Sequence, residues 1–156
     1  ECVEAMVKIS NSIESSVNYW KRFVKRGLYS GKSDDILENI AYTSCAMAEH
    51  MNADAIVAYT HTGTSAKKLA GMGPGCPIIA VTDDEKTFHQ LSVVWGVLPV
   101  LVEGEDVPDA TIARGIEELK AEGILESGDV VVLSGGAQTV VSKDCTQKVI
   151  GGVLKI

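Results

Sequence analysis

Aromatic side chains are scarce in this 156-residue chain, so its core must come mainly from aliphatic residues. Phe, Trp and Tyr together make up 5% of the residues, whereas hydrophobic residues of all kinds make up 46%. A core of Val, Ile, Leu and Ala is typical of parallel strands that helices bury on both faces. A chain of this length forms one domain, which can bury roughly two-thirds of its unfolded surface. The composition therefore favours the α/β class.

Positive charge is also in short supply. Lys and Arg number 14 against 21 Asp and Glu, which gives a formal net charge of −7. A duplex-binding surface needs concentrated positive charge, so we expect no nucleic-acid partner. The one basic cluster comprises Lys21, Arg22, Lys25 and Arg26, and it closes a predicted helix. Cations there suit the negative end of the helix dipole, and a phosphate or polyanion site is the alternative interpretation.

The chain has no paired cysteine motif and no long apolar run. Its four cysteines, Cys2, Cys45, Cys76 and Cys145, are widely separated, which predicts reduced thiols in a cytoplasmic protein rather than a disulfide framework or a zinc site. No apolar run reaches the roughly 20 residues that span a bilayer, and no signal peptide is present, so we expect no membrane partner.

The first segment predicts one long helix. Apolar residues recur at steps of three or four, which places them on one stripe of a helix of about 23 residues that Gly27 ends. The stripe comprises Cys2, Met6, Ile9, Ile13, Val17, Trp20 and Val24. The chain begins with Glu1 rather than Met, and the helical spacing of apolar residues starts at Cys2 with no N-cap residue before it. We therefore expect the sequence to be part of a larger protein.

A second helix is predicted after residue 32. Ser33 or Asp35 is its N-cap, and Glu38 stands three residues after Asp35, at capping-box spacing. Its expected buried face comprises Ile36, Leu37, Ile40, Ser44, Met47 and Ala48.

The pattern then changes to short β-rich runs that alternate with helices. Strands are predicted at residues 55–60, 76–82, 97–103, 129–134 and 148–156. Alternation of this kind predicts a parallel sheet with helices on both faces. Pro99 lacks an N–H donor, so its strand should lie at an edge of the sheet. Residues 135–147 predict no helix, so the last strand should return antiparallel.

The turn after the first predicted strand is the strongest candidate for a binding site. It comprises Thr60, His61, Thr62, Gly63, Thr64 and Ser65 and leads directly into a predicted helix. Free N–H groups and the positive end of the helix dipole favour an anion there. The hydroxyls add donors, and Gly63 lets the backbone approach a ligand closely. The plainer alternative is that Thr64 or Ser65 only caps the helix.

A second candidate loop, Ser134-Gly135-Gly136, follows the fourth predicted strand. Open α/β sheets bind ligands outside the carboxyl ends of strands, where the strand order reverses. If the first and fourth strands flank that point, the two loops face one crevice.

The remaining polar and aromatic residues suggest no catalytic or metal centre. We interpret Asp83-Asp84-Glu85 as the charged start of a helix rather than a metal site, and Trp20 and Trp95 as core or interface anchors. No Ser/His/Asp, Cys/His or paired-carboxylate spacing stands out.

These stretches together resemble the C-terminal domain of pyruvate kinases. The stretch AIVAYTHTGTSAKKLAGMGPGCPIIAVTDDEKTFHQLSVVWGVLPVLVE carries the family's T-x-[ST]-G-x-[ST]-A turn, its CPIIAVT strand and its GVxPVL strand. GDVVVLSGG is similar to the family's GDxVVxTxG. ECVEAMVKISNSIES resembles the last helix of the family's catalytic barrel. The resemblance divides the chain into residues 1–26, the barrel-like helix, and residues 27–156, the C-terminal domain.

The resemblance implies a fold and a ligand. The implied fold is a three-layer α/β/α sandwich with a five-stranded sheet, four strands parallel and the last antiparallel. The turn of residues 60–65 would hold a phosphate of an allosteric effector, either a sugar bisphosphate or a sugar monophosphate or AMP. Ser134, Gly135 and Gly136 would supply other contacts. The stretch after Gly136 has no cation before Lys143, which favours a monophosphate.

The resemblance also implies what the chain lacks. Family catalysis uses Lys, Arg and metal-binding carboxylates on the barrel, with magnesium and potassium, so we expect no catalytic residue, no cofactor and no pyruvate kinase activity in this chain alone. Its expected partners are its own barrel domain and further copies, through the C-terminal domains. Two alternatives stay open: a stand-alone protein that binds phosphorylated metabolites, and a purely structural assembly module.

Overall fold

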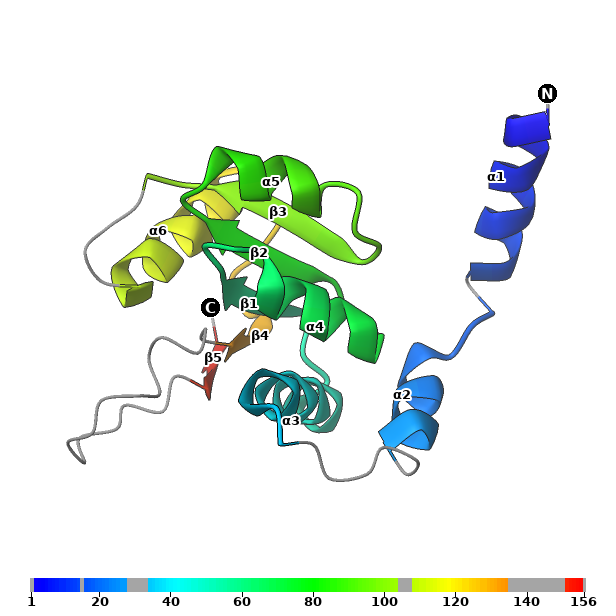
Figure 1. Ribbon diagram of the computed structural model, residues 1–156, viewed down its shortest axis with the longest axis horizontal. Coiled ribbons are helices and arrows are strands. Elements are labelled where there is room, and N and C mark those ends of the chain that lie inside the picture. The colour runs from blue at the N-terminus through cyan, green and yellow to red at the C-terminus, as the bar shows by residue number, and fades with distance from the viewer. Residues whose placement is uncertain (1, 15, 28–33, 104–107, 135–150, 156) are drawn as a thin grey trace.

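The sheet organises the molecule. The computed structural model describes residues 2–14, 16–27, 34–103, 108–134 and 151–155 (Figure 1). Five strands lie in the order β3-β2-β1-β4-β5. Their bounds are β1 Ala55–Tyr59, β2 Ile78–Thr82, β3 Val97–Leu101, β4 Val130–Ser134 and β5 Gly151–Lys155. Strands β1 to β4 run parallel, and β5 pairs antiparallel with β4. The predicted α/β class with a parallel sheet is confirmed.

Helices cover both faces of this sheet. Helices α3 (Ile36–Met51) and α4 (Thr64–Met72) pack on one face, where Ala48, Ile56 and Leu69 belong to one buried cluster. Helix α5 (Glu85–Leu91) lies on the same face, because its Leu91 packs with Ala66 and Ala80. Helix α6 (Pro108–Ala121) buries its apolar residues against the opposite face.

Edge position explains why a proline is tolerated in β3. Pro99 is paired in register with Ala80 of β2, and β3 has no strand on its other side among the described residues. A residue without an N–H donor costs a sheet least at such an edge. The predicted edge position is confirmed.

The prediction of one long N-terminal helix is wrong. The structure has two helices, α1 (Cys2–Glu14) and α2 (Tyr19–Gly27). The Ser16 backbone N–H and hydroxyl both donate to the Ile13 carbonyl, at 2.8 and 2.6 Å. The Asn18 side chain then accepts from the Lys21 N–H at 2.8 Å and starts α2. Such short polar side chains compete with helical hydrogen bonds, so they break the helix although the apolar spacing continues.

Of the two N-terminal helices, only α2 has a buried residue. Helix α2 is fixed by Phe23, which is 3% exposed and contacts the rings of Trp20 and Tyr42, at centroid distances of 6.1 and 5.4 Å. The predicted role of Trp20 as an anchor is confirmed. Helix α1 has no buried residue, and Figure 1 shows it apart from the sheet and its helices.

Helix α3 starts where the sequence predicts and buries a different stripe. Asp35 is the N-cap, and its Oδ1 accepts from the N–H of Leu37 at 2.9 Å. The buried residues are Ala41, Ser44, Cys45 and Ala48, whereas Ile36 is 53% exposed. The expected face is therefore only partly right. The small residues let α3 approach the sheet closely, because protein interiors are closely packed. Close packing, rather than the hydrophobicity of the side chains, therefore determines which residues of α3 face the sheet.

A glycine of α6 sets the distance of this helix from the sheet. A Cβ at Gly115 would lie 2.8 and 2.9 Å from the two γ-methyl groups of Val81. We expect Gly115→Ala to lower the free energy of unfolding by about 1–3 kcal/mol, because the added methyl overpacks this contact. Urea unfolding measures the change.

The matched control for Gly115→Ala is Gly71→Ala in α4. A Cβ there meets no atom within 4 Å. This substitution should leave stability unchanged or raise it by roughly 0.5–1 kcal/mol, because alanine is the better helix former. Equal stability of the two variants would show that α6 does not approach β2 through Gly115.

Of the helices that the structure describes, none is both long enough and apolar enough to cross a bilayer.

Candidate functional site

The candidate site lies where the strand order reverses. Strand β1 has β2 on one side and β4 on the other, and all three run parallel. Their carboxyl ends therefore meet at the same edge of the sheet. The chain proceeds from β1 to β2 and β3 in one direction and then places β4 on the opposite side of β1. The first and fourth strands do flank the point of reversal, which was the condition for a shared crevice. Open α/β sheets bind ligands at such switch points.

The turn after β1 leaves the start of α4 without a side-chain cap. Gly63 is the N-cap residue, with φ 76° and ψ −3°, and no side chain caps the helix. The Gly63 carbonyl accepts from the Lys67 N–H at 3.0 Å, so the helical hydrogen bonds begin there. The alternative that Thr64 or Ser65 caps the helix is therefore wrong. The first N–H groups of a helix have no intrahelical acceptor, and here they stay open to a ligand.

Glycine is required at position 63 for two reasons. Its positive φ lies in the left-handed region that favours glycine. A Cβ would also lie 3.3 Å from a methyl of Thr87 and 3.4 Å from a methyl of Leu91. Helix α5 therefore packs directly against the backbone of the turn at Gly63.

The hydroxyls of the turn differ in exposure. Thr60 is 4% exposed, and its N–H donates to the Val81 carbonyl at 2.9 Å, which ties it to the end of the sheet. Thr62 and Thr64 are exposed, with their hydroxyl oxygens 3.0 Å apart. Ser65 is half-buried. The exposed hydroxyls of Thr62 and Thr64 thus lie next to the open N–H groups of the helix start, and buried Thr60 ties the turn to the sheet.

His61 is held by a carboxylate that the sequence analysis assigned only to a helix start. Its Nδ1 lies 2.6 Å from Oδ1 of Asp83, and the other oxygen of Asp83 accepts from the Tyr59 hydroxyl at 3.3 Å. The hydrogen bond to Asp83 and its negative charge raise the pKa of His61, and the charge of Asp84 adds to this. Burial raises the pKa of Tyr59, with Asp83 contributing. The imidazolium is therefore the favoured state of His61 over a wider pH range.

The strand register explains why His61 and Asp83 meet. Tyr59 of β1 pairs with Val81 of β2, and His61 and Asp83 each follow two residues later. Residues at equal distances beyond paired positions of neighbouring parallel strands lie side by side. The equal spacing of His61 and Asp83 from their strands is visible in the sequence. Their contact could be predicted from it only if the register of β1 and β2 were known.

Asp84 has a structural task. Its Oδ2 accepts from the Thr87 N–H at 2.7 Å and caps α5. Hydrogen bonding with the side chain of Thr87 and with this N–H lowers the pKa of Asp84. The Thr87 hydroxyl in turn donates to the His61 carbonyl at 2.8 Å. The start of α5 thus fixes the backbone of the turn as well as the His61 side chain.

The second predicted loop is represented by its first residue. Ser134 ends β4, is 2% exposed, and accepts a hydrogen bond of 3.1 Å from the Ser44 hydroxyl of α3. Its hydroxyl is thus engaged within the core rather than facing a ligand. Gly135 and Gly136 lie outside the described residues.

The thiols of Cys45, which is buried, and Cys76, which is half-buried, both have a raised pKa. Burial raises the pKa of Cys45 to about 12 and that of Cys76 to about 11. The thiolate is the reactive form, so a raised pKa disfavours both cysteines as nucleophiles at neutral pH. In the part of the chain that the structure describes, no group of three or more His, Cys, Asp or Glu side chains could hold a metal ion.

Fold and site together define an open α/β domain with an uncapped helix start at its switch point. The family described as "Pyruvate kinase, alpha/beta domain" matches residues 38–149. The chain is 32% identical over 143 residues to the pyruvate kinase of Clostridium acetobutylicum, covering 91% of this chain and 30% of that protein. It is 28% identical over 150 residues to the pyruvate kinase of Thermotoga maritima, covering 96% of this chain and 31% of that protein.

A solved structure shows the same fold. The crystal structure of Cryptosporidium parvum pyruvate kinase superposes with a TM-score of 0.76 at 23% sequence identity, covering 86% of this chain and 28% of that one. This chain therefore belongs to the pyruvate kinase alpha/beta domain family. It spans less than a third of the length of the relatives named here.

Proposed function

We propose that this domain binds a phosphorylated metabolite at the turn of residues 60–65 and regulates a longer pyruvate kinase through it. The observation that carries the proposal is the start of α4, where Gly63 supplies the left-handed N-cap and no side chain occupies the helix N–H groups. A phosphate group there gains both the N–H donors and the positive end of the dipole. The exposed hydroxyls of Thr62 and Thr64 lie 3.0 Å apart beside this helix start, and Ser65 is the second residue of the helix.

The charges near the turn favour a ligand with one phosphate. His61 lies within the turn, and its partner Asp83 and the neighbouring Asp84 are both acidic. Of the two lysines that follow the turn, Lys68 pairs with Asp35 at 2.7 Å, and Lys67 lies 3.5 Å from the side-chain oxygen of Gln90. A second phosphate close by would be repelled by these carboxylates. We therefore propose a sugar monophosphate or a nucleoside monophosphate as the effector.

Calorimetric titration with glucose 6-phosphate tests the proposal, and Ser65→Ala is the informative variant. The Ser65 hydroxyl stands at the helix start and has no hydrogen-bond partner among the described residues. If it donates to the phosphate, its removal should weaken binding by about 1.5–3 kcal/mol, as for hydrogen bonds to charged groups.

Ser12→Ala is the control for this substitution. Its hydroxyl donates to the Ile9 carbonyl on exposed α1, remote from the turn (Figure 1). It should bind glucose 6-phosphate as the parent does. Equal affinities of the parent and Ser65→Ala would remove Ser65 from the site. Tighter binding of fructose 1,6-bisphosphate than of glucose 6-phosphate would contradict the monophosphate preference.

We also propose that α1 packs against the rest of a longer chain. Its apolar residues are exposed: Val3, Met6, Val7, Ile9 and Ile13 are between 51% and 71% accessible. An exposed apolar stripe of this length marks an interaction surface. In this proposal the stripe contacts a catalytic barrel domain that transfers the phosphoryl group of phosphoenolpyruvate to ADP with magnesium and potassium. Copies of the protein would associate through this domain, in the cytoplasm.

A further inference from the structure

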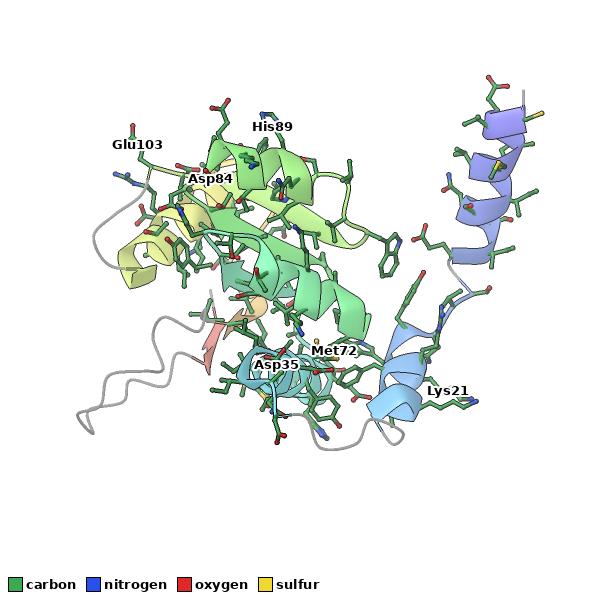
Figure 2. All side chains as sticks on the ribbon, viewed as in Figure 1. Lys21, Asp35, Met72, Asp84, His89 and Glu103 are labelled. Carbon is green, nitrogen blue, oxygen red and sulfur yellow. The ribbon has the colours of Figure 1, made fainter. Side chains whose placement is uncertain are left out.

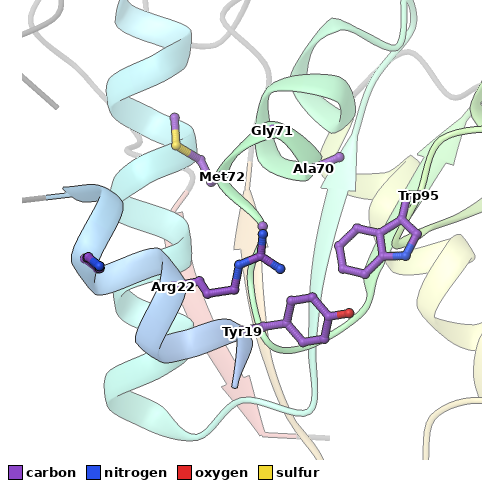
Figure 3. A pocket seen from close by; sticks show the side chains of 8 residues that line it. Tyr19, Arg22, Ala70, Gly71, Met72 and Trp95 are labelled. Carbon is purple, nitrogen blue, oxygen red and sulfur yellow. The ribbon is translucent and has the colours of Figure 1, made fainter. Parts of the chain in front are cut away.

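A cavity of about 820 Å³ lies at the other end of α4 from the turn (Figure 3). It opens between α2, the last turn of α4 and the segment that joins α5 to β3. Its volume falls within the roughly 300–1,000 Å³ of small-molecule sites. The lining residues are Tyr19, Arg22, Lys25, Ala70, Gly71, Met72, Gly73 and Trp95.

Helix α2 has two stripes of side chains, one that packs on the core and one that lines the cavity. Trp20 and Phe23, three residues apart, face the core, and a Cβ at Gly75 would lie 2.5 Å from the Trp20 indole nitrogen. Tyr19, Arg22 and Lys25 repeat at the same step and line the cavity. The core contacts of Trp20 and Phe23 thus fix the helix, and Tyr19, Arg22 and Lys25 lie on the side that faces the cavity.

Two aromatic rings form one wall. The rings of Tyr19 and Trp95 lie 5.1 Å apart between centroids, tilted by 38°. Trp95 is 54% exposed, although an indole gains more from burial than most side chains. A planar ring placed against this pair would cover exposed aromatic surface and gain stacking energy.

Two cations approach the same space. Arg22 extends toward the cavity in Figure 3, and Lys25 also lines it. Neither forms an ion pair with a residue that the structure describes. A guanidinium group binds phosphate or carboxylate through two parallel hydrogen bonds. The last turn of α4 adds backbone carbonyls, which accept from ring N–H or amino groups.

From these groups we infer that the cavity binds a heteroaromatic ring that carries one phosphate, as in a nucleoside monophosphate. The ring lies against Tyr19 and Trp95, and the phosphate is bound by Arg22 and Lys25. This site is distinct from the turn of residues 60–65. The nine residues of α4 separate the two by roughly 13 Å at 1.5 Å per residue, so the inference stands whether or not the turn binds its ligand.

The test is a titration of the ¹⁵N-labelled chain with AMP, followed by NMR. We expect saturable shifts of the Trp95 indole N–H and of the Gly71 and Gly73 amides. Adenosine, which lacks the phosphate, and ribose 5-phosphate, which lacks the ring, should each bind there at least about 10-fold more weakly, because each loses one set of contacts. Shifts at Trp95 that are equally strong with ribose 5-phosphate would overturn the ring assignment, and shifts confined to Thr64 and Ser65 would overturn the site.

Arg22→Gln and Lys21→Gln form a matched pair. Both remove one positive charge from α2, but Lys21 points away from the domain in Figure 2 and does not line the cavity. Arg22→Gln should weaken AMP binding by about 10-fold or more, whereas Lys21→Gln should change it by less than about two-fold, as expected of a solvent-screened charge. Equal losses in both variants would show a general charge effect and refute the site. Trp95→Ala removes one of the two rings and should also weaken binding.

Discussion

Replacing Gly63 by Val should abolish binding of glucose 6-phosphate. A valine at φ 76° is strained, and its Cβ would crowd a methyl of Thr87 at 3.3 Å and touch a methyl of Leu91 at 3.4 Å. The turn can relieve both only by rotating the peptide groups that lead into α4. The N–H groups would then no longer converge on the phosphate, which removes their contribution and that of the dipole together. Calorimetry should detect no heat of binding at ligand concentrations that saturate the parent.

Gly73→Val separates the loss of the site from a loss of stability. Gly73 is the C-cap of the same helix, and its φ of 68° imposes a similar strain, but a Cβ there meets no atom within 4 Å. Both variants should unfold more easily than the parent, by about 1–3 kcal/mol for a strained backbone. Only Gly63→Val should lose phosphate binding. If Gly63→Val binds glucose 6-phosphate as tightly as Gly73→Val does, the turn is not the site.

Phosphate binding should weaken as the pH rises through the pKa of His61. Asp83 raises this pKa above its ordinary value of 6.5, because the carboxylate 2.6 Å from Nδ1 stabilises the imidazolium. The protonated ring can donate to a phosphate through Nε2, whereas the neutral ring, with its proton kept on Nδ1 by Asp83, presents a lone pair there. We expect the contribution of His61 to the affinity, read as the affinity of the parent relative to that of His61→Lys, to fall about 10-fold between pH 6 and pH 9, the size of one charge-assisted hydrogen bond.

The comparison with His61→Lys isolates this effect. The phosphate itself gains charge near pH 6, which strengthens binding as the pH rises and is common to both proteins. Lysine remains charged throughout, so the ratio of the two affinities reports His61 alone. Asp83→Asn should move the midpoint of this ratio to lower pH, because it removes the group that raises the pKa of His61. Parallel pH profiles for the parent and His61→Lys would show that His61 takes no part in binding.

The contact between His61 and Asp83 also makes the stability of the fold depend on pH. Because the folded-state pKa of His61 is raised, its contact with Asp83 stabilises the fold fully below the pKa of the unfolded chain. This contribution is lost as the pH rises through the folded-state pKa. His61 is largely exposed, so the solvent screens the interaction and the effect on unfolding is small.

The sequence predicted those parts of the fold that follow from local patterns. The short β-rich runs became strands, Pro99 was found at an edge, and Asp35 and Asp84 cap their helices. The break between α1 and α2 was missed because the apolar spacing continues through it, while Ser16 and Asn18 decide the hydrogen bonds. Periodicity reports which face can be buried, but it does not report which backbone hydrogen bonds a side chain will replace.

The sequence predicted the backbone of the candidate turn, but it did not predict the contact between its histidine and a carboxylate. The uncapped start of α4 follows from Gly63, which is visible in the sequence. The contact between His61 and Asp83 joins residues 22 positions apart and depends on the pairing of β1 with β2. The engagement of Ser134 by Ser44, 90 positions away, depends likewise on how α3 packs on β4. Contacts of this kind arise from tertiary structure, which local patterns do not contain.

The most direct test of the central claim is a titration of the ¹⁵N-labelled chain with glucose 6-phosphate, with glucose as the control. We expect saturable shifts of the Thr64, Ser65 and Ala66 amides with glucose 6-phosphate and none with glucose, because the phosphate is bound by the open N–H groups at the start of α4. Amide signals of these three residues that stay unchanged at saturating ligand, or that move equally with glucose, would contradict it.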